Sequence, residues 1–187
     1  MIQQLIATPS ISSVSPEFDQ SNLAVVTLLA DWCEALGFHT EIRMLDNNKA
    51  NLIATYGKGV GGLILSGHTD TVPYDEGKWQ SDPFRLSEAD NRFYGLGSAD
   101  MKSFLALALD VIQRIDLQHL SAPLILLATA DEESSMSGAK ALVKAGKPQG
   151  RYAIIGEPTN MRPVRMHKGI FMEAIHLQGQ QPQHPPP

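Results

Sequence analysis

Short apolar runs of strand character in this chain end directly in histidine or glutamate side chains. The run over 63–66 leads into His68, the run over 124–128 into Glu132 and Glu133, and the run over 152–155 into Glu157. Buried strands of α/β proteins are near-continuous apolar runs, and ligands bind where the carboxyl ends of such strands meet. The pattern therefore predicts an α/β fold with a ligand site at one edge of its sheet.

Apolar residues at helical spacing alternate with these runs along the chain. Helices are predicted over 19–36, 103–114 and 137–145. Further strands are predicted over 40–43 and 51–56, and a hairpin is expected to pair 84–86 with 92–94. The runs over 63–66 and 152–155 are expected to be buried strands. Strands that alternate with helices predict an open sheet covered by helices on both faces.

The charge and composition of the chain limit its partners. Its 187 residues are 43% hydrophobic, which is enough to bury the core of a domain. The formal net charge is -5 and Lys and Arg form no cluster, which excludes nucleic acid and an anionic membrane as expected partners. We therefore expect a small-molecule partner.

Cysteine usage and the N-terminal sequence bear on location. Cys33 is the single cysteine, which rules out an intramolecular disulfide or a multi-cysteine zinc site and fits a reducing compartment. We expect Cys33 to be a small packed residue. The first residues lack the basic start and apolar middle of a signal peptide, and no apolar run has the length of a membrane span. These features predict a soluble, cytoplasmic protein.

The turns that follow the apolar runs carry an imidazole and several carboxylates. The side chains are His68, Asp70, Asp100, Glu132, Glu133 and Glu157. Imidazole nitrogen and carboxylate oxygen are ligands of zinc and similar divalent cations. Like charges gathered after a buried strand cost stability unless a cation neutralises them. Together these motifs predict a site for two divalent cations.

Each motif taken by itself has a simpler interpretation. The His-Asp pair at 68–70 fits a loop histidine beside a charged partner, and Asp100 fits the N-cap of the helix that follows it. The glutamate pair at 132–133 fits a solvated acidic turn, and Glu157 fits an ordinary turn residue before proline. Jointly, the motifs favour the metal site.

Longer segments around these residues resemble a known family. They are SGHTDTVP at 66–73, YGLGSADMK at 94–102, TADEE at 129–133 and IGEPT at 155–159. These segments resemble the di-zinc aminoacylase and carboxypeptidase family that includes succinyl-diaminopimelate desuccinylase. Within that family, the segments 7–12, 29–32, 132–139 and 163–169 are most similar to the bacterial acetylornithine deacetylases. The resemblance extends over nearly the whole chain, to about Gln180.

The resemblance implies a fold and a metal-ligand set. The implied fold is a three-layer α/β/α catalytic domain of the zinc-exopeptidase kind, with a mixed, mostly parallel sheet. His68 and Glu157 would hold one zinc ion, Glu133 would hold a second, and Asp100 would bridge the two. Cobalt is expected to substitute for zinc.

The resemblance also implies a reaction. Glu132 would act as general base, taking a proton from a water held by the metals, and Asp70 would orient the imidazole of His68. The implied reaction converts N-acetyl-L-ornithine and water to L-ornithine and acetate, a step of arginine biosynthesis. Another amidohydrolase of the family, a desuccinylase or a dipeptidase, remains open, as does a metal-binding fragment without catalysis.

The chain departs from the family in its C-terminal part. Family members are longer, homodimeric, and carry an inserted dimerisation or lid domain and a late histidine ligand. We expect residues 1–168 to belong to the catalytic domain, 169–180 to be the first strand of the lid domain, and 181–187 to be a proline-rich tail outside the family pattern. Without the late histidine, we expect one zinc ion to be retained, the second to bind weakly, and activity to be very low.

Overall fold

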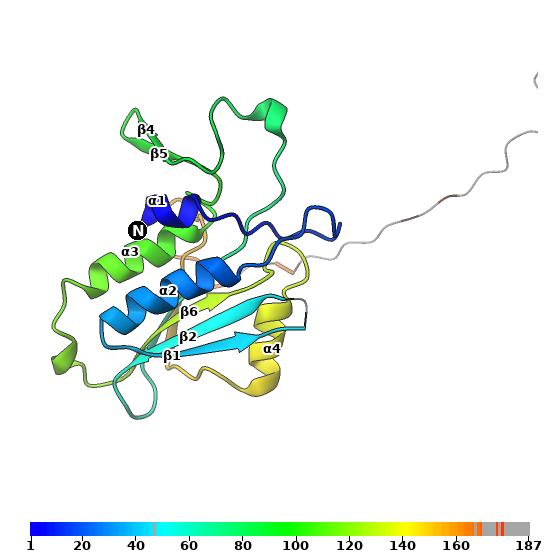
Figure 1. Ribbon diagram of the computed structural model, residues 1–187. Coiled ribbons are helices and arrows are strands. Elements are labelled where there is room, and N and C mark those ends of the chain that lie inside the picture. The colour runs from blue at the N-terminus through cyan, green and yellow to red at the C-terminus, as the bar shows by residue number, and fades with distance from the viewer. Residues whose placement is uncertain (47, 167, 170–174, 176, 178–187) are drawn as a thin grey trace, which may run out of the picture.

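The computed structural model describes residues 1–46, 48–166, 168–169, 175 and 177. Within these residues, the main sheet has the strand order β1-β2-β6-β3-β7 (Figure 1). Its strands are β1 (His39–Met44), β2 (Ala50–Tyr56), β3 (Leu63–His68), β6 (Leu124–Thr129) and β7 (Tyr152–Ile155). The pairs β6–β3 and β3–β7 are parallel, whereas β2 is antiparallel to both of its neighbours. The strands of the main sheet other than β2 therefore run in one direction, which confirms a mixed, mostly parallel sheet.

Helices cover both faces of this sheet. One face carries α1 (Ile2–Ile6), α2 (Leu23–Ala35) and α3 (Lys102–Ile112), and the other carries α4 (Ser137–Ala145). Leu29 and Leu109 pack with Leu126 in the larger core cluster, and all three are fully buried. On the α4 face, Leu142 packs with a smaller group of apolar residues. The layers are thus α/β/α, as predicted, although α1 was not anticipated.

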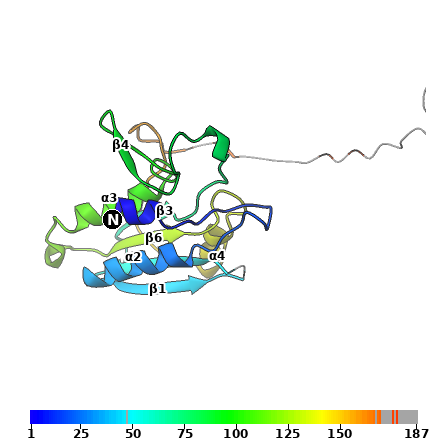
Figure 2. The ribbon, with the colours of Figure 1, turned by 45° about the horizontal axis from the view of Figure 1, so that its top comes forward.

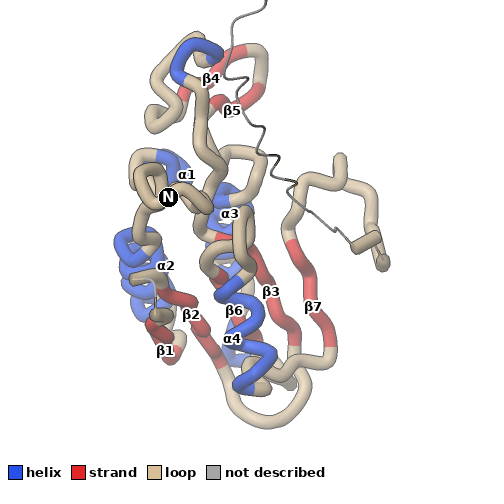
Figure 3. The backbone as a smooth tube through the Cα atoms, turned by 90° about the vertical axis from the view of Figure 1, so that its right-hand side faces the viewer, coloured by secondary structure: helices blue, strands red, loops and turns tan. Residues whose placement is uncertain are grey.

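The strand β7 is exposed, so the prediction of a buried strand over 152–155 is wrong. The exposed fractions of Tyr152, Ile154 and Ile155 are 64%, 51% and 62%. Figure 3 shows β7 at the edge of the sheet, beside β3. The core clusters of the described residues include none of its side chains. Residues 63–66 of the neighbouring β3, also expected to be buried, are half-buried.

Two predicted boundaries differ from the structure because side chains hold the backbone in turns. The helix expected from residue 19 begins at Leu23, since the Asp19 carboxylate accepts a hydrogen bond from the amide of Ser13. The hairpin consists of β4 (Ser87–Ala89) and β5 (Arg92–Tyr94), and it projects away from the sheet (Figure 2). Its first strand does not start at residue 84 because Asp82 holds the Phe84 amide in a preceding turn.

Several other features of the described chain bear on the predictions. Cys33 is fully buried, and burial raises the pKa of its thiol to about 12, as expected for a packed residue. Short 3-10 helices, η1 and η2, lie at Glu76–Lys78 and Leu117–His119. Across the described residues, no helix has the length and apolar character needed to cross a bilayer. The predicted lid strand and proline-rich tail lie almost entirely outside the described residues.

Candidate metal centre

The parallel register of β6, β3 and β7 aligns their carboxyl ends at one edge of the sheet. His68, the last residue of β3, pairs with Thr129 of β6, and Ser66 pairs with Ile155 of β7. Figure 3 shows these strands side by side. The segments that follow β6 and β7 therefore start next to His68.

His68 lies at the centre of the predicted ligands. Its Nε2 is 3.1 Å from Asp100 Oδ1 and 4.0 Å from both Glu132 Oε2 and Glu157 Oε1. Ligand atoms of His68, Asp100 and Glu157 lie within 4.8 Å of one another, and so do those of His68, Glu132 and Glu133. The structure thus brings these predicted ligands and the predicted base together around one imidazole.

Asp70 completes the cluster from the other side of the imidazole ring. The Nδ1 atom of His68 is 3.0 Å from the backbone oxygen of Asp70 and 3.6 Å from its Oδ1. The other carboxylate oxygen, Oδ2, accepts a hydrogen bond of 3.0 Å from the Glu133 amide. Asp70 is buried, and its Oδ1 has no hydrogen-bond partner among the described residues. Asp70 therefore links the imidazole to the segment after β6.

The structure overturns the simpler interpretation of Asp100 as a helix cap. The N-cap of α3 is Met101, and no side chain caps the helix. The Asp100 carboxylate faces His68 instead. A plain solvated turn is also wrong for the 131–133 segment, because Asp131 is buried and Glu132 and Glu133 are half-buried.

Burial and mutual repulsion raise the pKa values of Glu133 and Glu157. Burial raises the pKa of Glu133 to about 7, and the nearby charge of Asp100 adds to the shift although His68 opposes it. Burial also raises the pKa of Glu157, where His68 opposes the shift and Asp100 and Glu132 support it. For His68, burial lowers the pKa, but the charges around it, Asp70 foremost, outweigh that effect and raise it. Crowded acidic groups around one imidazole form a donor set that fits divalent zinc.

Comparison with known proteins identifies the family of the chain. Residues 64–184 match the profile of peptidase family M20/M25/M40. The chain belongs to this family. The acetylornithine deacetylase of Pasteurella multocida (strain Pm70) is 52% identical to it over 181 residues, which are 96% of this chain and 47% of that protein. The M20 chain thus spans about half the length of this curated relative.

Solved structures share the fold of this M20 chain. Human carnosine dipeptidase 1 superposes with a TM-score of 0.67 at 23% identity, covering 82% of this chain and 37% of that one. The M20 family metallo-carboxypeptidase Sso-CP2 from Sulfolobus solfataricus gives a TM-score of 0.71 at 20% identity, covering 83% and 36%. Both matches confirm the α/β class of the domain.

Two buried lysines beside the cluster were missed by the sequence analysis. Lys49 contacts the carboxylates of Asp19 and Asp131 at 2.5 and 2.6 Å. Lys102, the first residue of α3, donates hydrogen bonds to the Thr8 carbonyl at 2.7 Å and to Ser10 Oγ at 3.3 Å. Burial lowers the pKa of Lys102 to about 8, with Asp70 opposing the shift. Lys49 belongs to no periodic pattern or motif, and Lys102 ends the motif at 94–102 without any signal that its side chain is buried.

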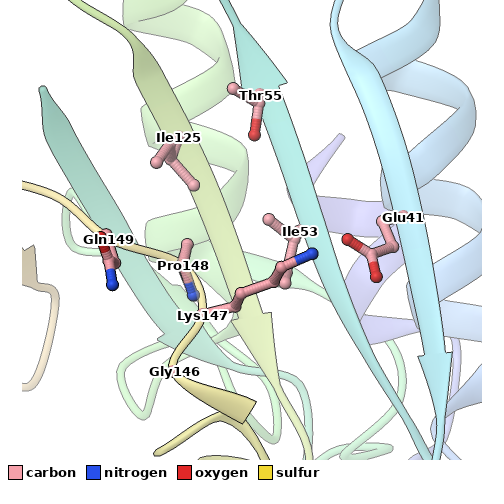
Figure 4. A pocket seen from close by; sticks show the side chains of 8 residues that line it. All are labelled: Glu41, Ile53, Thr55, Ile125, Gly146, Lys147, Pro148 and Gln149. Carbon is pink, nitrogen blue, oxygen red and sulfur yellow. The ribbon is translucent and has the colours of Figure 1, made fainter. Parts of the chain in front are cut away.

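Two cavities lie near the sheet of the M20 chain. A cavity of about 280 Å³ adjoins Asp100 and Glu133 and is lined by Thr71, Trp79 and Leu96 among others. The Thr71 hydroxyl is buried and has no hydrogen-bond partner among the described residues. A larger cavity of about 470 Å³ lies over β1, β2 and β6, next to the segment that follows α4 (Figure 4). The larger cavity shares no residue with the metal cluster, whereas the smaller one adjoins it.

Proposed function

We propose that the cluster around His68 binds zinc and supports hydrolysis of the amide bond of N-acetyl-L-ornithine, which yields L-ornithine and acetate. The observation that carries this proposal is the convergence of Asp100, Glu132 and Glu157 on the Nε2 atom of His68. The 52% identity to an acetylornithine deacetylase supports the choice of substrate. This substrate would place the protein in arginine biosynthesis.

We expect the donor set to hold one zinc ion firmly and a second more weakly, because the assignment gives the second ion no imidazole ligand. His68 and Glu157 would hold one ion, Glu133 would hold the other, and Asp100 would bridge them. The site of the first ion is supported by the ligand atoms of His68, Asp100 and Glu157, which lie within 4.8 Å of one another. Bound zinc would polarise the amide carbonyl and lower the pKa of the attacking water. Cobalt, which accepts similar nitrogen and oxygen ligands, is expected to substitute.

Proton transfer falls to Glu132. Its side chain is 37% exposed, so it reaches the solvent-accessible side of the cluster while its Oε2 stays 4.0 Å from His68 Nε2. Glu132 would take a proton from the attacking water as the new C–O bond forms. It would then deliver that proton to the amide nitrogen as the C–N bond breaks. Asp70 acts through His68 by fixing the orientation of the imidazole.

The surroundings of the cluster are consistent with a small N-acyl amino acid as substrate. The cavity beside Asp100 and Glu133 has Val72, Trp79 and Leu96 in its lining, which suits an acyl group or an aliphatic chain. We also propose a cytoplasmic location, which the lone, buried Cys33 supports.

Zinc binding by the purified chain tests the metal site. We expect the wild-type chain to bind zinc in a calorimetric titration and His68→Ala to lose that binding. The control is His119→Ala, since His119 is exposed and lies on the surface beside Asp116. A wild-type chain that binds no zinc, or a His68→Ala variant that binds as well as the wild type, would refute the proposal.

Hydrolysis tests the base and the substrate. With zinc present, we expect the wild-type chain to turn over N-acetyl-L-ornithine only slowly, and Glu132→Ala to keep its metal but to reduce that turnover by about 100-fold or more. N-succinyl-diaminopimelate and a dipeptide, tested in parallel, cover the other substrates of the family. Faster turnover of either one would replace the proposed substrate.

A further inference from the structure

A buried carboxylate organises the segment that carries Glu132 and Glu133. Asp131, directly before them, has a positive φ of 65° and its side chain turns back into the protein. Its oxygens accept hydrogen bonds of 3.0 Å from the hydroxyls of Ser134 and Ser137, and another from Ser135. The segment that presents the glutamates is therefore wrapped around the Asp131 carboxylate.

Lys49 supplies the counter-charge for Asp131. Its side chain is 1% exposed, and its Nζ lies 2.6 Å from Asp131 Oδ1 and 2.5 Å from Asp19 Oδ1. Ser12 joins the same group, donating a hydrogen bond of 2.6 Å to Asp131 Oδ1 and lying 3.3 Å from Lys49 Nζ. A buried carboxylate that loses its cation is left with an uncompensated charge, so it must move or take up a proton. The position of Asp131 therefore depends on Lys49.

The ends of the same segment are held separately. Asn51 Oδ1 accepts a hydrogen bond of 2.9 Å from the Ala130 amide, and its Nδ2 donates one of 3.0 Å to the Gly138 carbonyl. These bonds fix where the segment leaves β6 and where it enters α4. Between those ends, the attachments include the Asp131 group, the bond from the Glu133 amide to Asp70, and a bond from Lys140 Nζ to the Ser135 carbonyl. Loss of the Lys49 charge would thus loosen the middle of the segment while its ends stay in place.

We propose that Lys49 is a positioning residue of the metal centre: through Asp131 it holds Glu132 and Glu133 toward His68. The effect of Lys49 on metal binding and catalysis rests on the proposed function. Its effect on the position of the segment 131–137 does not. Displacement of a metal ligand or a catalytic base by a fraction of an ångström weakens binding and catalysis strongly. A lysine that served stability alone would lower protection from unfolding evenly and leave the geometry of the glutamates intact.

Amide hydrogen exchange of the metal-free chain tests the coupling directly. We compare wild type with Lys49→Met, which keeps the length of the side chain and removes its charge, and with Lys144→Met, the same substitution at an exposed site on α4. In Lys49→Met we expect exchange across 131–137 to accelerate by about tenfold or more, with the amides of β3 and β6 unchanged. Lys144→Met should match wild type. Unchanged exchange at 131–137, or equal acceleration throughout the sheet, would overturn the proposal.

Zinc titration tests the consequence for the metal centre. If zinc binds in two events, the event that is lost in Glu133→Gln is assigned to the ion held by Glu133, and so to the segment 131–137. We expect Lys49→Met to weaken that event by about 10- to 100-fold while binding at His68 and Glu157 persists. Equal weakening of both events, or of neither, contradicts a positioning role. If the wild-type chain binds no zinc, the proposed function fails, and the exchange experiment still decides the role of Lys49.

A milder variant covers the case in which Lys49→Met does not fold. Ser12→Ala removes a hydroxyl from Asp131 and leaves the ion pair with Lys49 in place. We expect a smaller acceleration of exchange in the same segment, 131–137. Exchange equal to that of wild type in Ser12→Ala would contradict the claim that this buried group holds the segment.

Discussion

Both ring nitrogens of His68 face carboxylate groups, and the two sides have different tasks. On one side, Nδ1 is positioned to donate a hydrogen bond to the Asp70 backbone oxygen at 3.0 Å. In a neutral imidazole, that bond favours the tautomer in which Nε2 has a free lone pair, which is the form that binds metal. On the other side, Nε2 faces Asp100, Glu132 and Glu157. The geometry of a single residue therefore separates orientation of the ring from metal binding.

At this scale, we predict that Asp70→Asn weakens zinc binding by about 10- to 100-fold. The amide keeps the shape of the side chain but removes the negative charge beside Nδ1 and makes the imidazole a poorer donor. Competition with a chelator of known affinity measures the change. The matched control is Asp116→Asn, which alters an exposed aspartate paired with the surface residue His119. An Asp70→Asn variant with wild-type affinity would show that this carboxylate does not tune the ligand.

The helix α4 packs tightly against the end of β6, and a glycine makes that contact possible. A Cβ atom at Gly138 would overlap the backbone oxygen of Ala130 and Oδ1 of Asn51. Gly138 is buried near the start of the helix, where its carbonyl also accepts the bond from Asn51. The spacing between β6 and α4, and with it the span of the segment carrying the glutamates, depends on this small residue.

The corresponding prediction is that Gly138→Ala destabilises the chain by about 1–3 kcal/mol, because the added methyl group is forced into packed backbone. Helix propensity by itself predicts the opposite sign, a gain of about 1 kcal/mol. Urea denaturation followed by circular dichroism distinguishes the two. Gly169→Ala, at a glycine with open space around it, serves as the reference. If Gly138→Ala unfolds at a higher urea concentration than the wild type, α4 can shift on the sheet to make room for the methyl group.

For the whole molecule, the open edge of the sheet is the main departure from a closed, covered domain. The strand β7 pairs with β3 on one side, and its apolar side chains at 152, 154 and 155 are exposed. Unpaired backbone groups next to apolar side chains on an edge strand favour pairing with another chain. The described surface therefore combines a polar site with an apolar edge strand.

We accordingly predict that the purified chain self-associates as its concentration rises, and that Ile154→Lys reduces this association. A charge on an edge strand opposes pairing with a second strand. Sedimentation velocity over a concentration series gives the measurement. Val143→Lys adds the same charge at an exposed position on α4. If both variants associate as strongly as the wild type, β7 is not the contact between the chains.

The sequence analysis grouped His68, the two glutamates at 132–133 and Glu157 because they follow apolar runs, whereas the roles of these residues came from the family resemblance. The exposure of β7 could not be anticipated, because an apolar run does not reveal whether a strand has a neighbour on both sides. The ion pair between Lys49 and Asp131 could not be predicted either, because the two residues are distant in the sequence and neither belongs to a periodic pattern. Local patterns thus reveal ligands more readily than the groups that hold them.

The reversed direction of β2 has a consequence for how such sites are assembled. Leu52 of β2 lies opposite Ala128 of β6. The amino end of β2 therefore lies beside the carboxyl ends of the other strands of the main sheet. Lys49 and Asn51 enter the site from there, ahead of an apolar run instead of behind it. In a mixed sheet, the site residues follow the parallel strands in the sequence but precede a strand of opposite direction. In an unfamiliar sequence, the polar residues before each apolar run therefore need inspection as well as those after it.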